Sequence, residues 1–583
     1  MASNRKKAFA AVAALASASV VLAGCGGGSG SSGSNGNSNT TAKATKGGTL
    51  TYYIRDALEH TDPQRVYLGR ELTNLDRTVY RRLVSFPAST DTTKATTPVA
   101  DLATDTGHSS QGGKVWKFTV KSGVKWQDGK PITCEDFKYG ASRVFATDVI
   151  TGGPNYLLSY LDIPLGSDGL PTYKGPYTTK NNDVASFNKA ITCQGQTITY
   201  HFKQPWPDFP LAVASLGMMD PYRKDKDQGD KSNFQIFSNG PYMVQGKLDH
   251  NRGYTLVRNP NYDPKTDNPE IREANPDKIV YDIGKTGEQI ADQLIADNGA
   301  AQTAVTDRSI PPAYYTQITG SVADRAVNVQ SPFTDYLVLN FARVKNLAVR
   351  QALAAATNDQ GWIDAGGGSK SYDPADSIVS PTVKGYQSNP AFKRPSSGDV
   401  DAAKQILQKA GVKTPINLSF TYPSTPTADK QAAVLKDTWK QAGFNVTLDG
   451  VANSSTYYTN IQQPDQKADI IWAGWGADWP SAITVTAPLF DSRPNLRKNT
   501  NGQDYGRYQS DAFNKFITQA QTASSLDAQT KALQQADIQL GKDVAYIPLE
   551  IQKFYLLRGS KVTGYMTDAA SSMYPDLGPI GVQ

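Results

Sequence analysis

Strands that alternate with amphipathic helices in the C-terminal half constrain the fold of this chain more than any other feature. Apolar residues recur with helical periodicity in two segments, and they alternate or run together in three shorter ones. The expected helices span 399–410 and 432–442, and the expected strands span 416–420, 444–448 and 469–472. This order predicts an α/β domain with a largely parallel sheet.

The segment after the last expected strand combines glycine, tryptophan and a carboxylate. Two glycines follow the apolar run, and we expect them to break the strand, because glycine permits tight turns and the close approach of a ligand. Trp475 and Trp479 then flank Asp478. Open α/β sheets bind ligands beyond the carboxyl ends of their strands, so this segment is a candidate binding site. The alternative interpretation is that both tryptophans belong to the core and that Asp478 caps a turn.

The same segment resembles the ligand-binding loop of a known family. Gly474-Trp475-Gly476-Ala477-Asp478 is similar to the loop of oligopeptide-binding proteins of ABC importers, the extracytoplasmic solute-binding proteins of family 5. In that family the loop carboxylate holds the α-ammonium of a bound peptide, and the adjoining strand pairs with the peptide backbone. The resemblance implies that Asp478 binds the amino terminus of a peptide, with Trp475, Gly476 and Ala477 around it.

A second and longer match covers residues 102–145. Lys125-Trp126-Gln127-Asp128-Gly129-Lys130-Pro131, followed by Thr133-Cys134-Glu135-Asp136, resembles a signature of the same family. Two further segments, 337–353 and 543–549, are similar to its crossings between lobes. The resemblance implies an α/β fold: a two-lobed, periplasmic-binding-protein-like clamshell (class II, cluster C type) with an extra small domain in lobe I.

The length of 583 residues exceeds what one hydrophobic core supports, so several domains are expected. The resemblance implies that Tyr67 and Leu68, from lobe I, pair with the ligand, and that the lobes close over it as a hinged clamshell. The expected parts are a signal peptide (1–24), a lipidated cysteine and flexible tether (25–46), lobe I (47–331, with an appended subdomain at about 86–204), lobe II (332–545) and a return to lobe I (546–583).

The N-terminus has the features of a bacterial lipoprotein signal. Residues 5–7 are basic and residues 8–22 are apolar, and the apolar stretch is shorter than the roughly 20 residues that span a membrane. Leu22-Ala23-Gly24-Cys25 is similar to a lipobox, which implies cleavage before Cys25 and its lipidation. Residues 26–48 are rich in Gly, Ser, Asn and Thr and are typical of a flexible tether. We therefore expect a protein anchored by lipid on the extracytoplasmic face of a bacterial cell membrane.

Lipidation of Cys25 leaves two of the three cysteines, Cys134 and Cys193, as an even pair in an oxidising compartment. A disulfide between them is expected, and the alternative is two separate buried thiols. Neither cysteine has a partner at zinc-ligand spacing, and the four histidines are scattered. No metal site and no cofactor are expected.

The charge balance and the motifs limit the function classes further. The net charge is +6, and removal of Arg5, Lys6 and Lys7 leaves about +3 (6 − 3) with no basic run, which gives no support to nucleic-acid binding. No nucleophile–base pair indicates an enzyme. The hypothesis is a monomeric receptor that captures peptides and delivers them to the permease subunits of an ABC importer. The alternative is the same scaffold with another solute: nickel, haem, a glycan or a signalling molecule.

Overall fold

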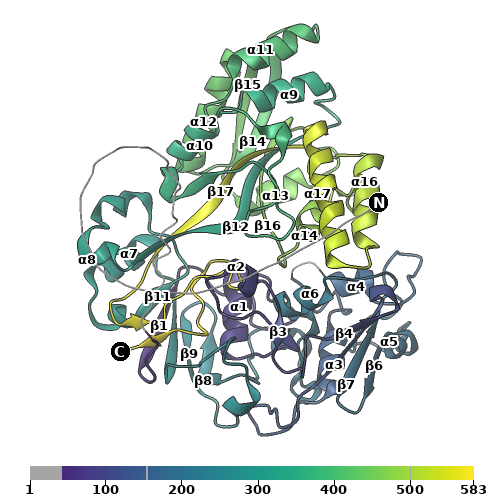
Figure 1. Ribbon diagram of the computed structural model, residues 1–583, viewed down its shortest axis with the longest axis vertical. Helices are drawn as coiled ribbons and strands as arrows, with labels where there is room; N and C mark the ends of the chain where they lie inside the picture. The colour runs from purple at the N-terminus through teal and green to yellow at the C-terminus, as the bar shows by residue number, and fades with distance from the viewer. Residues whose placement is uncertain (1–42, 153–154, 499) are drawn as a thin grey trace, which may run out of the picture. The chain divides into compact units, whose positions relative to one another are not determined.

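The computed structural model describes residues 43–152, 155–498 and 500–583 (Figure 1). One five-stranded sheet, in the order β11–β1–β10–β9–β8, forms the centre of lobe I. Strand β1, the second of the five, pairs in parallel with β10 and β11, whereas the β10–β9 and β9–β8 pairs are antiparallel. The bounds are β1 Thr49–Ile54, β8 Tyr242–Asp249, β9 Gly253–Arg258, β10 Lys278–Ile283 and β11 Ala304–Thr306.

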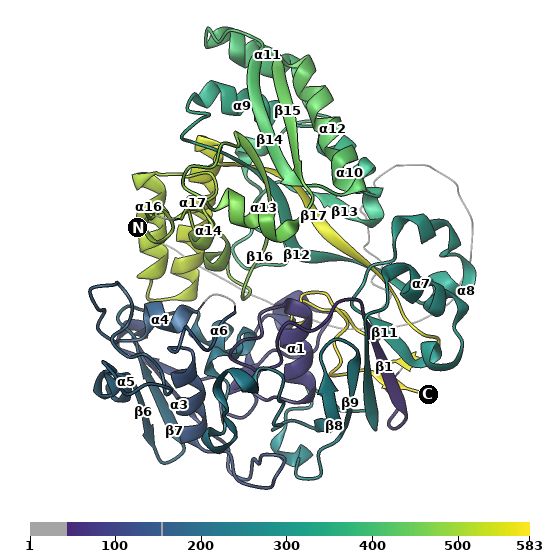
Figure 2. The same ribbon diagram turned by 180° about the vertical axis from the view of Figure 1, so that it is seen from behind.

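A six-stranded sheet, in the order β13–β17–β12–β16–β14–β15, forms the centre of lobe II. Helices flank it, and α12 (Pro426–Gln441) packs against β15 (Figure 2). The two-lobed α/β clamshell is thus confirmed. The bounds are β12 Ala326–Leu339, β13 Tyr372–Pro374, β14 Ile416–Pro423, β15 Phe444–Val451, β16 Ile470–Gly476 and β17 Tyr546–Leu557.

The prediction of a largely parallel sheet was wrong for the strands β13, β17, β12 and β16, which pair with one another in antiparallel fashion. Only β14 pairs in parallel, with β15 and β16, and the remaining pairs are antiparallel. The reason is the connection to lobe I. The chain enters lobe II along β12 and leaves along the neighbouring β17, which runs beside it in the opposite direction (Figure 1). The predicted lobe boundaries themselves stay a prediction.

Local sequence explains the helices between these strands. Helix α11 (Val400–Lys409) begins where the Asp399 side chain accepts a hydrogen bond from the Ala402 N–H at 2.8 Å, which satisfies one of the free donors of the first turn. Its buried side chains, Ala403 and Leu407, are four residues apart and therefore lie on one face.

A four-stranded sheet, in the order β4–β5–β7–β6, forms the appended subdomain of lobe I. Its strands are β4 His108–Ser110, β5 Val115–Thr119, β6 Ile191–Gln194 and β7 Thr197–His201. Helix α3 (Cys134–Arg143) begins at Cys134, which forms a disulfide with Cys193 on β6, and the two Cα atoms are 5.8 Å apart. The bond joins a helix and a strand that are 59 residues apart in the sequence.

Loss of this disulfide is expected to destabilise lobe I. Replacement of both Cys134 and Cys193 by serine removes a link that restricts the unfolded chain, and native bridges of this kind typically contribute about 2–5 kcal/mol. Urea unfolding of the double variant measures the loss. Two thiols per chain that react with a labelling reagent under denaturing, non-reducing conditions would contradict the bridge.

Buried arginine–aspartate pairs hold separate segments of lobe I together. Asp101 accepts hydrogen bonds from Arg81 Nε at 2.8 Å and from Arg272 Nη2 at 2.7 Å, and all three side chains are buried. Arg77 binds Asp576 in the C-terminal segment in the same way, at 2.8 Å. The Arg77–Asp576 pair ties the C-terminal segment to α1 (Gly69–Thr78), whereas the Asp101 cluster joins three segments within lobe I.

None of the helices in the described part of the chain is long and apolar enough to cross a membrane. Cys25 and the predicted lipobox lie outside the described residues.

Candidate functional site

Strand β16 continues through Gly474 and ends at Gly476, so the prediction that both glycines break the strand was wrong for Gly474. It pairs with β12 as far as Gly476. The glycines are required for space: a Cβ on Gly474 would lie 2.5 Å from Asp335 Oδ1, and one on Gly476 would lie 2.4 Å from Phe333 Cδ1. Side chains of β12 thus occupy the room that side chains at these two positions would take.

The other edge of β16 is covered over only part of its length. Strand β14 pairs with Ile470 and Ile471, and among the described residues no further strand pairs with Ala473–Gly476 on that edge. Strand edges with unpaired N–H and C=O groups readily accept an additional strand. This stretch of β16 is therefore able to bind an extended peptide backbone.

A cavity of about 400 Å³ adjoins this part of β16, and both lobes line it. The structure brings all six predicted ligand-binding residues together there: Tyr67, Leu68, Trp475, Gly476, Ala477 and Asp478. Sequence reasoning missed other residues of the lining, among them Arg70, Leu72, Asp335, Tyr458, Trp472 and Gln552.

The Asp478 carboxylate is enclosed between the two lobes, although the residue as a whole is partly exposed. Its two oxygens accept hydrogen bonds from the hydroxyls of Tyr67 and Tyr156, and its backbone N–H donates to Thr484 Oγ1 at 3.1 Å. Among the ion pairs of the described residues, none includes Asp478. Burial raises the pKa of Asp478 to about 6, although the bonds from Tyr156 and Tyr67 oppose this rise. A buried carboxylate without a positive partner is costly, and an entering cation would relieve that cost.

The two tyrosines reach Asp478 from separate segments. Tyr67 precedes Leu68, the N-cap of α1 (Gly69–Thr78), and its side-chain hydroxyl donates to Asp478. Tyr156 begins the short helix α4 (Tyr156–Tyr160) of the appended subdomain, 322 residues before Asp478. No sequence signal indicated Tyr156.

The two tryptophans of the loop have different roles. Trp475 is half-buried, lines the cavity and donates from Nε1 to the Thr484 carbonyl at 2.9 Å. Trp479 is buried, packs against Tyr156 with ring centroids 4.6 Å apart, and donates from Nε1 to the buried Asp208. The alternative interpretation, in which both tryptophans belong to the core, therefore holds for Trp479 and not for Trp475.

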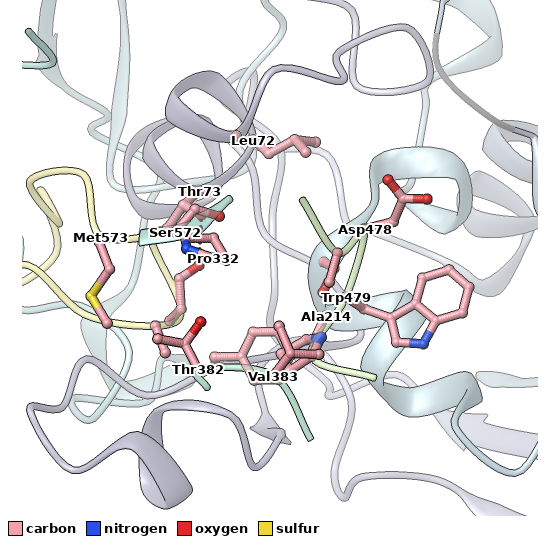
Figure 3. Close-up of a pocket in the computed structure, with 17 residues that line it drawn as sticks. Leu72, Thr73, Ala214, Pro332, Thr382, Val383, Asp478, Trp479, Ser572 and Met573 are labelled. Atoms are coloured by element: carbon pink, nitrogen blue, oxygen red, sulfur yellow. Dashed lines mark hydrogen bonds between the residues drawn. The ribbon is translucent and has the colours of Figure 1, made fainter. Parts of the chain in front are cut away.

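A smaller cavity of about 60 Å³ lies on another side of Asp478 (Figure 3). Asp478 and Trp479 stand on the side opposite Ser572 and Met573 of the C-terminal segment, and the Asp478 carboxylate points away from those two residues. Asp478 lines both cavities, so it lies at the boundary between them.

Within residues 43–152, 155–498 and 500–583, no group of three or more His, Cys, Asp or Glu side chains is placed to hold a metal ion.

Comparison with known proteins agrees with this architecture. The family model of the bacterial extracellular solute-binding proteins, family 5 Middle, matches residues 97–496. The oligopeptide-binding protein OppA of Bacillus subtilis is 24% identical over 452 residues, which is 73% of this chain and 75% of that protein. The probable D,D-dipeptide-binding periplasmic protein DdpA of Escherichia coli is 23% identical over 524 residues, or 87% and 90% of the two chains.

A solved structure shows the same fold along nearly the whole chain. The clavulanic acid biosynthesis oligopeptide binding protein 2 superposes with a TM-score of 0.82 at 24% identity, covering 94% of this chain and 100% of that one. The family match spans more than half of the sequence and includes the β16 loop with Asp478. This chain is a member of the bacterial extracellular solute-binding proteins of family 5.

Proposed function

We propose that this protein is a lipid-anchored receptor that captures peptides outside the membrane and delivers them to an ABC importer. As a member of its family it is a binding protein and not an enzyme. The observation that carries the proposal is the Asp478 carboxylate, which forms no ion pair with any described residue and lies beside a cavity of about 400 Å³ and an edge of β16 that no described strand covers.

Each part of this arrangement suits one part of a peptide. The α-ammonium carries a positive charge that Asp478 would bind, with the Tyr67 and Tyr156 hydroxyls beside it. The amide groups that follow would pair with the edge of β16 at Ala473–Gly476, which binds a backbone regardless of its side chains. Trp475 would form one wall of the site.

The relatives support the same ligand class. OppA of Bacillus subtilis is named as oligopeptide-binding, DdpA as probably D,D-dipeptide-binding, and the solved relative as an oligopeptide binding protein. A peptide receptor of this family would work as a monomer with the permease subunits of its importer.

The direct test is identification of the ligand that the protein carries. Protein purified from its native host without denaturation is unfolded in acid, and the released small molecules are analysed by mass spectrometry. Peptides with free amino termini are the expected result. Release of a metal complex, haem, a glycan or another non-peptide solute, together with no binding of synthetic peptides to the emptied protein, would refute the proposal.

The anchor has its own test. Cys25→Ser removes the only cysteine of the lipobox, and we expect the variant to appear in the soluble fraction or as an unprocessed precursor. Membrane fractionation and detergent-phase partitioning of wild type and variant measure this. Cys134→Ser is the matched control, because it removes a cysteine outside the signal and leaves partitioning unchanged. Detergent partitioning of Cys25→Ser equal to that of wild type would exclude lipidation at this residue.

A further inference from the structure

A second buried carboxylate, Asp335, faces the cavity that Asp478 lines. Asp335 lies on β12 directly opposite Gly474 of β16, and the missing side chain of Gly474 provides the space for its carboxylate. Its oxygens accept hydrogen bonds from Gln552 Nε2 at 3.1 and 3.3 Å. The side chain is only 4% exposed, so the carboxylate is almost fully enclosed.

Glu550 lies beside Asp335 on the same face of the sheet. The two residues are direct partners in the pairing of β12 with β17, and directly opposed residues share a face. Gln552, two positions after Glu550, lines the cavity, so the two side chains leave β17 on the same face, although Glu550 is not itself among the lining residues. Glu550 is 1% exposed, and its Oε2 atom has no hydrogen-bond partner in the described part of the chain.

In the described part of the chain, Asp335 and Glu550 both lack a cationic partner. Among the described residues, no lysine, arginine or histidine forms an ion pair with Asp335 or Glu550, whereas the buried Asp101 binds two arginines. The one arginine of the cavity lining, Arg70, is already paired with Asp307, 3.1 Å from its Nε. The cavity thus presents unneutralised acids at two separate positions, around Asp478 and around Asp335.

The titration of the pair agrees with this geometry. Burial raises the pKa of Asp335 to about 6, and burial together with the charge of Asp335 raises the pKa of Glu550. Both carboxyl groups therefore hold a proton more readily than exposed carboxyl groups do, and a bound cation would favour its release.

We propose that Asp335 and Glu550 form a second cation subsite of this cavity, which receives the basic side chain of an arginine or lysine in the bound peptide. This proposal rests on the proposed function, because it takes Asp478 as the site of the α-ammonium. Arginine is favoured, since its planar fork matches two carboxylates and stacks on aromatic rings. Trp472 and Tyr458 line the cavity and supply such rings.

The spacing of the two subsites limits the position of the basic residue. Asp335 is opposite Gly474, and Asp478 follows Gly474 by four residues. Four residues of extended chain span about 13 Å, at roughly 3.3 Å for each residue. A peptide that pairs with β16 and starts at Asp478 therefore reaches Asp335 within its first four residues.

The test compares alanine tetrapeptides that carry arginine at position 2, 3 or 4 with peptides that carry citrulline there. Citrulline has the shape of arginine without the charge, so the difference reports the subsite alone. Calorimetry with the wild-type protein is expected to show a preference for arginine of about 30-fold or more at one position. The arginine peptide should also release protons near pH 6, detected as a dependence of the binding heat on the buffer.

Variants separate this subsite from the site of the amino terminus. Asp335→Asn and Glu550→Gln should each reduce the preference for arginine over citrulline. Acetylation of the peptide amino terminus should still weaken binding to both variants. Asp478→Asn should weaken all the peptides and keep the preference. Asp373→Asn is the matched control: it is the same change in the same sheet, at a residue that pairs with Lys553, and it should alter neither property.

The outcomes are distinguishable. Equal affinity for arginine and citrulline peptides at every position, with tight binding of tetra-alanine, would overturn the second subsite and leave the proposed function intact. Failure of all peptides to bind would overturn both. A preference for arginine that survives in both Asp335→Asn and Glu550→Gln would show that other residues bind the side chain.

Discussion

Replacement of Asp478 by asparagine is expected to weaken the binding of a free tetrapeptide by about 30-fold to several thousand-fold. The carboxylate is buried, so its contact with an α-ammonium would form away from water, where loss of one partner of a charge pair typically costs about 2–5 kcal/mol. Asparagine keeps the shape of the side chain and still bonds to Tyr67 and Tyr156. The loss would therefore measure the charge and not the packing.

The matched experiment uses peptides with acetylated amino termini. Acetylation removes the positive charge from the ligand, so it should weaken binding to the wild-type protein about as much as the substitution does. It should have little further effect on Asp478→Asn. Calorimetry on the four combinations gives the coupling energy between the two groups. Equal affinity of the wild-type protein for free and acetylated peptides would remove Asp478 from this role.

Without ligand, Asp478→Asn should have a larger free energy of unfolding than the wild-type protein at neutral pH, but not at acidic pH. The pKa of Asp478 is raised to about 6 from an ordinary value near 4, so the fold favours the protonated form. Stability is lost as the pH rises through about 6, by an amount of order 2–3 kcal/mol, which Asp478→Asn would recover at pH 7.5 but not at pH 4. Thermal unfolding of emptied protein at both pH values measures this. A variant that is less stable at pH 7.5 would contradict it.

The second large effect is expected at Asp101, a buried carboxylate that, unlike Asp478, is paired with two arginines. Burial opposes its ionisation, yet the charges of Arg272 and Arg81 lower the pKa of Asp101 well below its usual range. Asp101→Asn would leave two buried guanidinium groups with less compensation, although Asp267 remains 2.7 Å from Arg272. Removal of one partner from a buried charge cluster typically costs about 3–5 kcal/mol.

Urea unfolding at pH 7 measures this loss of free energy of unfolding. Asp168→Asn is the control, because Asp168 lies in an exposed loop and its removal should leave the unfolding midpoint unchanged. The wild-type protein should also lose the contribution of Asp101 at low pH, because the pKa is depressed in the fold and the unfolded chain takes up a proton first. An Asp101→Asn midpoint equal to that of wild type would refute the structural role of the cluster.

Local patterns predicted the helices and strands of lobe II well because their causes are local. The capping side chain of Asp399 and the spacing of Ala403 and Leu407 belong to one helix and are visible in a short window of sequence. The antiparallel half of the sheet was not predictable in this way. It arises because the chain enters and leaves the lobe through neighbouring strands that are more than two hundred residues apart.

In the candidate site too, features with a local cause were predictable and features that depend on distant segments were not. The resemblance of the loop indicated Asp478 and its neighbours, and the structure places them around one cavity. Tyr156 was missed because its contact with Asp478 depends on how the appended subdomain packs against lobe II. Gly474 was misread because a glycine that makes room for a distant side chain looks, in sequence, like a glycine that makes a turn.

The two neighbouring connections of lobe II have a consequence for how receptors of this architecture diversify. Gln330 on β12 and Lys553 on β17 are direct partners, so the chain enters and leaves the lobe at points about 5 Å apart. Because its two ends lie so close together, lobe II can be exchanged between relatives as a single unit. A chimera that takes lobe II from a relative needs only two junctions, both in one two-stranded ribbon, and would exchange β16, Asp335 and Asp478 together.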